Sequence, residues 1–169
     1  EGIMIVGNGA EPSDLDPQTI TGVPERNITA TMFEGLTRSD PETLEARPGV
    51  AKNWAISDDG LTYTFHLRAG VTWSDGEPLD ANDFYASFRR MLAPQLGSDN
   101  SDQLYDVVNA EEFHKGQIDD FSKVGFRVID DLTLEIKLNH PASYLLKTMA
   151  SLTWVPVPIH VLEKHGDPL

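Results

Sequence analysis

The segment from Trp54 to Phe84 limits the possible folds more than any other part of the chain, because it combines two tight turns with an alternating strand pattern. Leu61 to Leu67 alternates apolar with polar residues and is rich in β-branched and aromatic side chains, which is typical of a strand with one buried face. Asp59-Gly60 follows a short hydrophobic segment at residues 54–56, and Asp75-Gly76 follows a short strand predicted at residues 71–73. Glycine accepts the positive φ that tight hairpin turns need. The segment therefore predicts antiparallel hairpins.

Helical spacing appears directly after this segment. Phe84, Phe88, Met91 and Leu92 recur at intervals of three and four residues, which predicts an amphipathic helix that ends before Pro94. Asp80 or Asn82 is the expected N-cap of this helix. Further helices are predicted from Pro24 to about Gly35, from about 102 to 115, from 143 to about 149, and from 159 to 164.

The remaining strand signals complete an α+β prediction. Residues 125–129 and 133–138 predict a second hairpin joined by Asp130-Asp131, and residues 37–40 predict a short strand or turn before a loop at 42–48. Ile3–Val6 predicts a buried strand, whereas the prolines among residues 155–158 exclude a central strand. The expected fold class is α+β, with antiparallel hairpins and interspersed helices.

Charge and cysteine content exclude several classes of function. The chain has 169 residues and a formal net charge of −14, which argues against nucleic acid and anionic membrane surfaces as partners, since both attract clustered Lys and Arg. Cysteine is absent, so neither disulfides nor thiolate metal sites are expected. The sequence contains no run of 18 apolar residues, so no transmembrane helix is predicted.

No residue pattern predicts catalysis, a cofactor or a metal. Gly7-Asn8-Gly9 matches the start of a dinucleotide fingerprint, but Pro12 replaces its third glycine and residues 13–24 do not predict the helix that would hold a pyrophosphate. The five histidines include no pair at helical i, i+4 spacing and no HExxH motif, and the aspartates lack the spacing of a calcium loop. We interpret the histidines and aspartates as structural or surface residues.

Aromatic residues are concentrated in and around the segment from Trp54 to Phe84. They could form an aromatic binding surface or the core of a small sheet, and we interpret them as core. The residues concerned are Trp54, Tyr63, Phe65, Trp73 and Trp154.

A series of short motifs runs in order along nearly the whole chain. It includes Leu15-Asp16-Pro17, Gly22–Glu25, Phe33–Leu36, Pro48–Ala51, Thr62–Arg68, Trp73–Pro78, Asp83-Phe84 and Pro156–Pro158. This series resembles the signature of the bacterial extracellular solute-binding proteins of the oligopeptide and dipeptide class, which serve ABC importers. Members of this class are about three times as long as this chain and fold as two lobes that close on a peptide. The resemblance thus matches the first third of a member.

The resemblance implies a division of the chain. Residues 1–34 would form the N-terminal part of the discontinuous large lobe, and residues 35–158 a smaller inserted α+β domain that contributes little to the ligand site. Residues 159–169 would begin the return to the large lobe. On this basis we expect residues 35–158 to support at least partial folding, and we expect the isolated chain to bind peptides poorly.

The resemblance also implies where a ligand is bound. The backbone of Thr21, Gly22, Val23 and Pro24 would pair with a peptide as an added strand, a mode that gives affinity without side-chain specificity. The acidic residue that the class carries before this glycine is Thr21 here, so a charge contact with a peptide amine is lost. The class also uses a tyrosine from the loop after the long helix. The matching loop has no aromatic residue, and its candidates are Ser98 and Asn100.

The resemblance implies a binding protein and not an enzyme. It would capture oligopeptides in the periplasm, or outside the cell on a lipid anchor in a Gram-positive organism, and deliver them to the membrane permease of an ABC importer. It would act as a monomer without a cofactor or metal. Binders of dipeptides, glutathione, nickel chelates and opines share the same motifs and remain alternatives. A peptide hydrolase whose chemistry lies in other sequence and an acidic docking module are alternatives from other classes.

Overall fold

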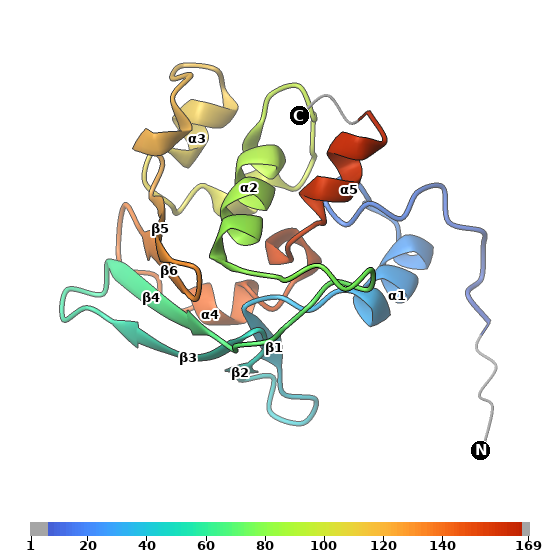
Figure 1. Cartoon of the computed structure of the whole chain (residues 1–169), viewed down its shortest axis with the longest axis horizontal. Coiled ribbons are helices and arrows are strands. Elements are labelled where there is room, and N and C mark those ends of the chain that lie inside the picture. Colours follow the sequence, from blue (N-terminus) through green and yellow to red (C-terminus); the bar gives the residue numbers. More distant parts are fainter. Residues whose placement is uncertain (1–6, 167–169) are drawn as a thin grey trace.

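A four-stranded antiparallel sheet, in the order β3-β4-β6-β5, organises the part of the chain that our computed structural model describes, residues 7–166. The strands are β3 (Ala51–Ile56), β4 (Thr62–Leu67), β5 (Phe126–Asp130) and β6 (Thr133–Lys137). β3 pairs with β4 and β5 with β6 as two hairpins, and β4 and β6 join them (Figure 1). The hairpins predicted at Asp59-Gly60 and at Asp130-Asp131 and the α+β class are confirmed. The strand predicted at Ile3–Val6 lies outside the described residues.

The segment from Trp54 to Phe84 folds largely as its sequence pattern predicts. Tyr63, Phe65 and Leu67 are buried on one face of β4, while the residues between them are only half buried. Gly60 adopts φ +70° in the turn between β3 and β4, and Gly76 adopts φ +95° in the second turn. The short strand predicted at 71–73 is wrong, because that segment makes only a single bridge, between Thr72 and Pro78.

Helix α2 (Ala81–Leu92) lies across the sheet and contacts β5 (Figure 1). Asp80 caps its first turn by accepting the N–H of Asn82, and the carboxylate of Asp83 accepts the N–H of Asp80 in return, which completes a capping box. Phe84 and Phe88 lie on its fully buried face, together with Met91 and Leu92. The predicted amphipathic helix and its cap are confirmed.

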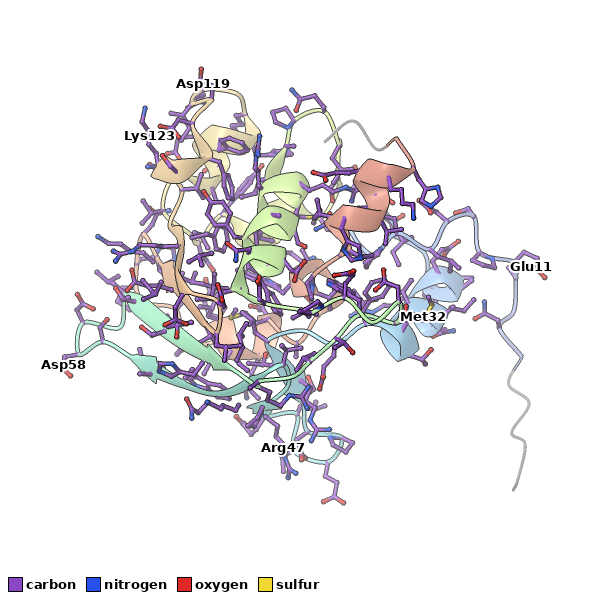
Figure 2. All side chains as sticks on the ribbon, in the orientation of Figure 1. Glu11, Met32, Arg47, Asp58, Asp119 and Lys123 are labelled. Carbon is purple, nitrogen blue, oxygen red and sulfur yellow. The ribbon has the colours of Figure 1, made fainter. Side chains whose placement is uncertain are left out.

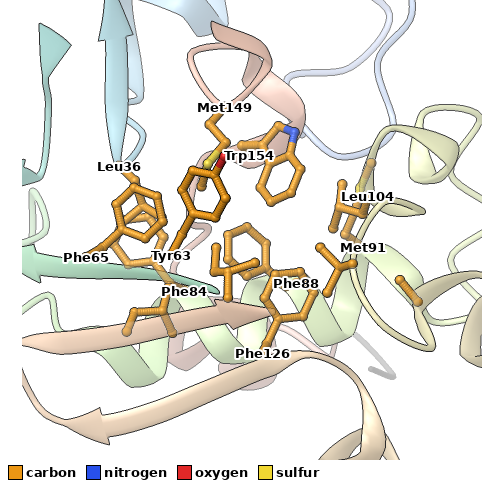
Figure 3. Packing of buried hydrophobic residues seen from close by; sticks show 14 of the residues in the cluster. Leu36, Tyr63, Phe65, Phe84, Phe88, Met91, Leu104, Phe126, Met149 and Trp154 are labelled. Carbon is orange, nitrogen blue, oxygen red and sulfur yellow. The ribbon is translucent and has the colours of Figure 1, made fainter. Parts of the chain in front are cut away.

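The core is an aromatic cluster between α2, the sheet and the segment around Trp154 (Figure 3). The ring of Phe88 lies 4.6 Å from that of Phe126 and 5.5 Å from that of Trp154, centroid to centroid. Trp154 is fully buried, and Trp54 and Trp73 are partly buried against the same cluster. The interpretation of these aromatic residues as core is confirmed.

Helix α1 (Val23–Met32) buries a different face from the one its sequence suggests. It contacts the rest of the chain through Glu25 and Thr29, whereas Val23 is 69% and Met32 60% exposed (Figure 2). It ends at Met32, although apolar spacing predicted a helix to about Gly35. Phe33 is already extended, and the carbonyls of Gly35 and Leu36 accept N–H groups from residues 49–51 in place of helical donors.

Two other predictions need correction. The loop expected at 42–48 contains β2 (Ala46–Pro48), which pairs with β1 (Thr37–Ser39) as a second, two-stranded sheet. The helix expected at 102–115 is two short helices, because Asn109 adopts a left-handed φ of +59° between them. These are the 3₁₀ helix η1 (Ser101–Leu104) and α3 (Ala110–His114).

The helices predicted at 143 to about 149 and at 159–164 are confirmed as α4 (Leu145–Thr148) and α5 (Ile159–Lys164). The 3₁₀ helices η2 (Phe121–Lys123) and η3 (Leu152–Trp154) were not predicted. Residues 155–158 form no strand, as their prolines require. Within residues 7–166, no helix has the length and apolar character needed to cross a membrane.

Candidate functional site

The predicted ligand-contact segment, Thr21 to Pro24, lies where the chain leaves a turn at residues 17–19 and enters α1. Gly22 has extended φ and ψ of −83° and 155° and is the N-cap, while Val23 and Pro24 already belong to the helix. Thr21 is exposed, and its backbone N–H and C=O make no hydrogen bond with any described residue. A strand-like partner can therefore pair with the backbone at Thr21, but the helical conformation of Val23 and Pro24 prevents the same pairing further along.

Ser98 and Asn100 face the protein chain. Ser98 is 5% exposed, and its hydroxyl donates to the backbone oxygen of Gln18. The side-chain amide of Asn100 donates to the backbone oxygen of Ile20 at 3.1 Å. Both side chains thus hold residues 18–20, the stretch that leads into Thr21 and Gly22. Their direct contact with a ligand stays a prediction.

Gln18 anchors the same stretch from its other side. Its fully buried amide donates to the backbone oxygen of Ser87 on α2 at 2.8 Å and accepts from Arg90 at 2.7 Å. Arg90, which is itself 5% exposed, also pairs with the carboxylate of Asp16 at 2.7 Å. Buried polar groups stabilise only when they are paired, and this network pairs each of them. The network attaches the residues just before α1 to α2, which lies 69 residues further along the chain at Ser87.

Glu25 shapes the start of α1. Its carboxylate accepts the backbone N–H of Ser13 at 2.9 Å and the hydroxyl of Ser13 at 3.1 Å. The N–H of Ser13 favours the ionised form and lowers the pKa of Glu25 below its ordinary value. A Cβ on Gly22 would lie 1.9 Å from the Glu25 carboxylate, so position 22 requires glycine while Glu25 holds this position.

We expect Glu25→Gln to lower the thermal unfolding midpoint at neutral pH, by a margin that shrinks on acidification. A lowered pKa stabilises the fold fully above the ordinary glutamate value of 4.5, and this contribution is lost as the pH falls below that value through the lowered one. Circular dichroism melts of both proteins across this range measure the margin. Glu11→Gln, at an exposed glutamate, is the matched control. A margin that does not change with pH would contradict the assignment.

A hollow of about 180 Å³ lies beside the entry to α1. It brings together Thr21, Gly22 and Asn100 from the predicted site, whereas Val23, Pro24 and Ser98 do not line it. Sequence reasoning missed Arg26, Gln103 and Ser151, which also line it. The position of Arg26, one helical turn after Gly22, could have been found from helical spacing. Gln103 and Ser151 come from distant segments that only the fold places here.

No cluster of metal ligands exists among the described residues. Three of the histidines contact protein groups that explain their positions. His160 pairs with Asp75 at 2.8 Å, His140 with Asp106 at 3.3 Å, and His114 lies 3.1 Å from the hydroxyl of Ser101. These contacts support the structural interpretation of the histidines.

Known proteins resemble the chain over almost all of its length. Residues 45–167 match the model of the family described as bacterial extracellular solute-binding proteins, family 5 Middle. The periplasmic oligopeptide-binding protein of Escherichia coli (strain K12) is 38% identical over 166 residues, which are 97% of this chain and 30% of that protein. A probable deoxycholate-binding periplasmic protein of the same organism is 38% identical over 162 residues, 95% of this chain and 30% of that protein. The chain thus spans about 30% of the length of these relatives.

Solved structures show the same likeness in three dimensions. A periplasmic oligopeptide-binding protein from Borrelia burgdorferi superposes with a TM-score of 0.88 at 42% identity, over 94% of this chain and 32% of that one. An oligopeptide-binding protein from Haemophilus influenzae, in complex with the peptide RPPGFSPFR, superposes with a TM-score of 0.88 at 35% identity, over 95% of this chain and 31% of that one.

Proposed function

The chain belongs to family 5 of the bacterial extracellular solute-binding proteins, and from this premise we propose that it forms part of a protein that captures peptides and delivers them to the permease of an ABC importer. Relatives are named as oligopeptide-binding proteins, and one of their solved structures holds a nine-residue peptide. The named relatives are periplasmic or extracellular solute-binding proteins. We propose the periplasm as the location, or the outer surface by a lipid anchor in a Gram-positive organism.

One observation from the structure carries the proposal. Thr21 is an exposed residue whose backbone N–H and C=O no described residue uses, and Gly22 after it has extended φ and ψ, while Gln18, Ser98 and Asn100 hold the preceding residues in place. A backbone that is held rigid but left unpaired is what strand addition by a peptide requires. Pairing through the backbone tolerates many side chains, which suits a transporter of varied peptides.

The proposed division of the chain follows the elements. Both sheets and α2 to α4 lie within residues 35–158, which we propose as the smaller inserted domain. Residues 1–34, which include α1, and residues 159–169, which include α5, would belong to the large lobe. In this division the peptide lies mainly against the large lobe and against sequence beyond this chain.

We assign the protein a binding role and not a catalytic one. The relatives are solute-binding proteins by name and family, and the proposed partners are an oligopeptide and a membrane permease. A monomer is proposed, and nucleic acid is excluded from the proposal because the net charge is −14.

Isothermal titration with defined peptides tests the proposal. We expect the complete polypeptide that carries this chain to bind tri- to pentapeptides with a Kd of about 1 μM or tighter, and the isolated 169 residues to bind them far more weakly. Dipeptides, glutathione, a nickel chelate, an opine and deoxycholate serve as competing ligands. If the protein bound one of these solutes and no peptide, that solute would become the proposed ligand. Release of free amino acids from a bound peptide would favour a hydrolase.

A further inference from the structure

The hollow beside Thr21 and Gly22 is lined by a positive charge and by no negative one. Arg26 is the only charged residue among those that line it, and the others are apolar or neutral polar side chains. Acidic residues outnumber basic ones in this chain by 27 to 13, yet no acidic side chain among the described residues pairs with Arg26. Arg26 therefore lines the same hollow as Thr21 without an acidic partner among the described residues.

The neutral groups of the hollow add to the same polarity. The amide oxygen of Gln103 accepts the hydroxyl of Ser151 at 3.3 Å, which leaves the amide NH₂ of Gln103 as a donor without a partner among the described residues. The hydroxyl of Thr21 also has no partner among the described residues. The hollow thus offers the side-chain donors of Arg26 and Gln103 without an acidic residue among its lining.

Donors around a guanidinium match a carboxylate. Arginine presents a planar fork of N–H groups that can bind both oxygens of a carboxylate at once, and such charge-assisted hydrogen bonds are stronger than neutral ones. A volume of about 180 Å³ accommodates an acidic side chain or the end of a peptide, but not a large ligand.

We propose that Arg26 makes this hollow a subsite for a carboxylate of the bound peptide, supplied either by an Asp or Glu side chain or by the peptide C-terminus. This inference rests on the proposed peptide-binding function and adds a preference to it. Backbone pairing at Thr21 would supply affinity for any peptide, and the hollow would select among them. Arg26 is exposed, so solvent screens the interaction and the selection is modest, about threefold to tenfold in Kd.

Calorimetry on the complete polypeptide tests the subsite. The ligands are alanine pentapeptides that carry Glu or Gln at each position in turn, each with a free or an amidated C-terminus. We expect one Glu position, or the free C-terminus, to bind about threefold to tenfold tighter than its neutral counterpart at low salt, and less so at high salt. The amidated series shows which carboxylate is the source.

Two variants and a control assign the preference to Arg26. Arg26→Gln should remove the preference and leave the affinity for neutral peptides within about twofold, and Arg26→Lys should retain part of it. Arg89→Gln, at an exposed arginine outside this hollow, should retain all of it. Equal binding of Glu and Gln peptides, or a preference that survives in Arg26→Gln, would overturn the subsite while leaving the peptide-binding function in place. Failure of every peptide to bind would overturn the proposed function itself.

Discussion

Phe88→Ala is expected to destabilise the protein by about 3–5 kcal/mol, the range for removing a fully buried aromatic ring. Phe88 has no exposed surface, and its ring lies between those of Phe126 and Trp154. It comes from α2, whereas Phe126 belongs to β5 and Trp154 to η3, so its loss opens a cavity where three elements meet (Figure 3). Chemical denaturation, followed by tryptophan fluorescence, measures the change in unfolding free energy.

Two controls separate the cavity from a general effect of substitution. Phe88→Leu keeps most of the volume and should cost clearly less than the alanine variant. Ile129→Ala truncates an apolar side chain that is 43% exposed on the edge strand β5, and it should cost less than about 1 kcal/mol. If Phe88→Ala were no more destabilising than Ile129→Ala, the aromatic cluster would not be the main core.

Gln18→Leu is expected to weaken peptide binding by about tenfold and to lower stability by about 1–3 kcal/mol, the cost of leaving buried partners without their hydrogen bonds. The leucine keeps similar volume but cannot accept from Arg90 or donate to the backbone oxygen of Ser87. The stretch that presents Thr21 would then lose its attachment to α2. Titration with one neutral pentapeptide and denaturation of the same samples measure both effects.

The two readouts distinguish positioning from stability alone. Phe88→Leu perturbs the core without touching the entry to α1, so it should leave the Kd nearly unchanged while lowering stability. Gln95→Leu, at an exposed glutamine, should change neither quantity. If Gln18→Leu lost stability but bound the peptide as tightly as the original protein, Gln18 would not position the Thr21 backbone.

Local signals in the sequence predicted the regular elements with strong periodicity. The alternation along β4, the Asp-Gly turn before it and the spacing of Phe84 and Phe88 on α2 each act over a few residues, so they are visible without the fold. The predictions failed where distant partners decided the outcome. Leu36 extends the helical spacing of α1, but its carbonyl accepts the N–H groups of Gly49 and Ala51, and it lies outside the helix.

The candidate site follows the same distinction. Motifs pointed to residues 21–24, 98 and 100, but they could not reveal that Ser98 and Asn100 bind the backbone of residues 18–20, because those contacts span 80 residues of sequence. Nor could they identify Gln18, because its hydrogen bond to Ser87 on α2 forms only when the chain folds.

The sequence by itself determined the α+β class, the two hairpins, the amphipathic helix α2 and the family, because turn chemistry, periodicity and motif order are local properties of the chain. Only the tertiary structure decided which polar groups are paired and which remain available. It paired Glu25 with Ser13 and Gln18 with α2. It left the backbone of Thr21 without a hydrogen bond and the side chain of Arg26 without an ion pair among the described residues, and both residues line the same hollow. Hydrogen bonds form between neighbours in space, and folding brings those neighbours together from distant parts of the chain.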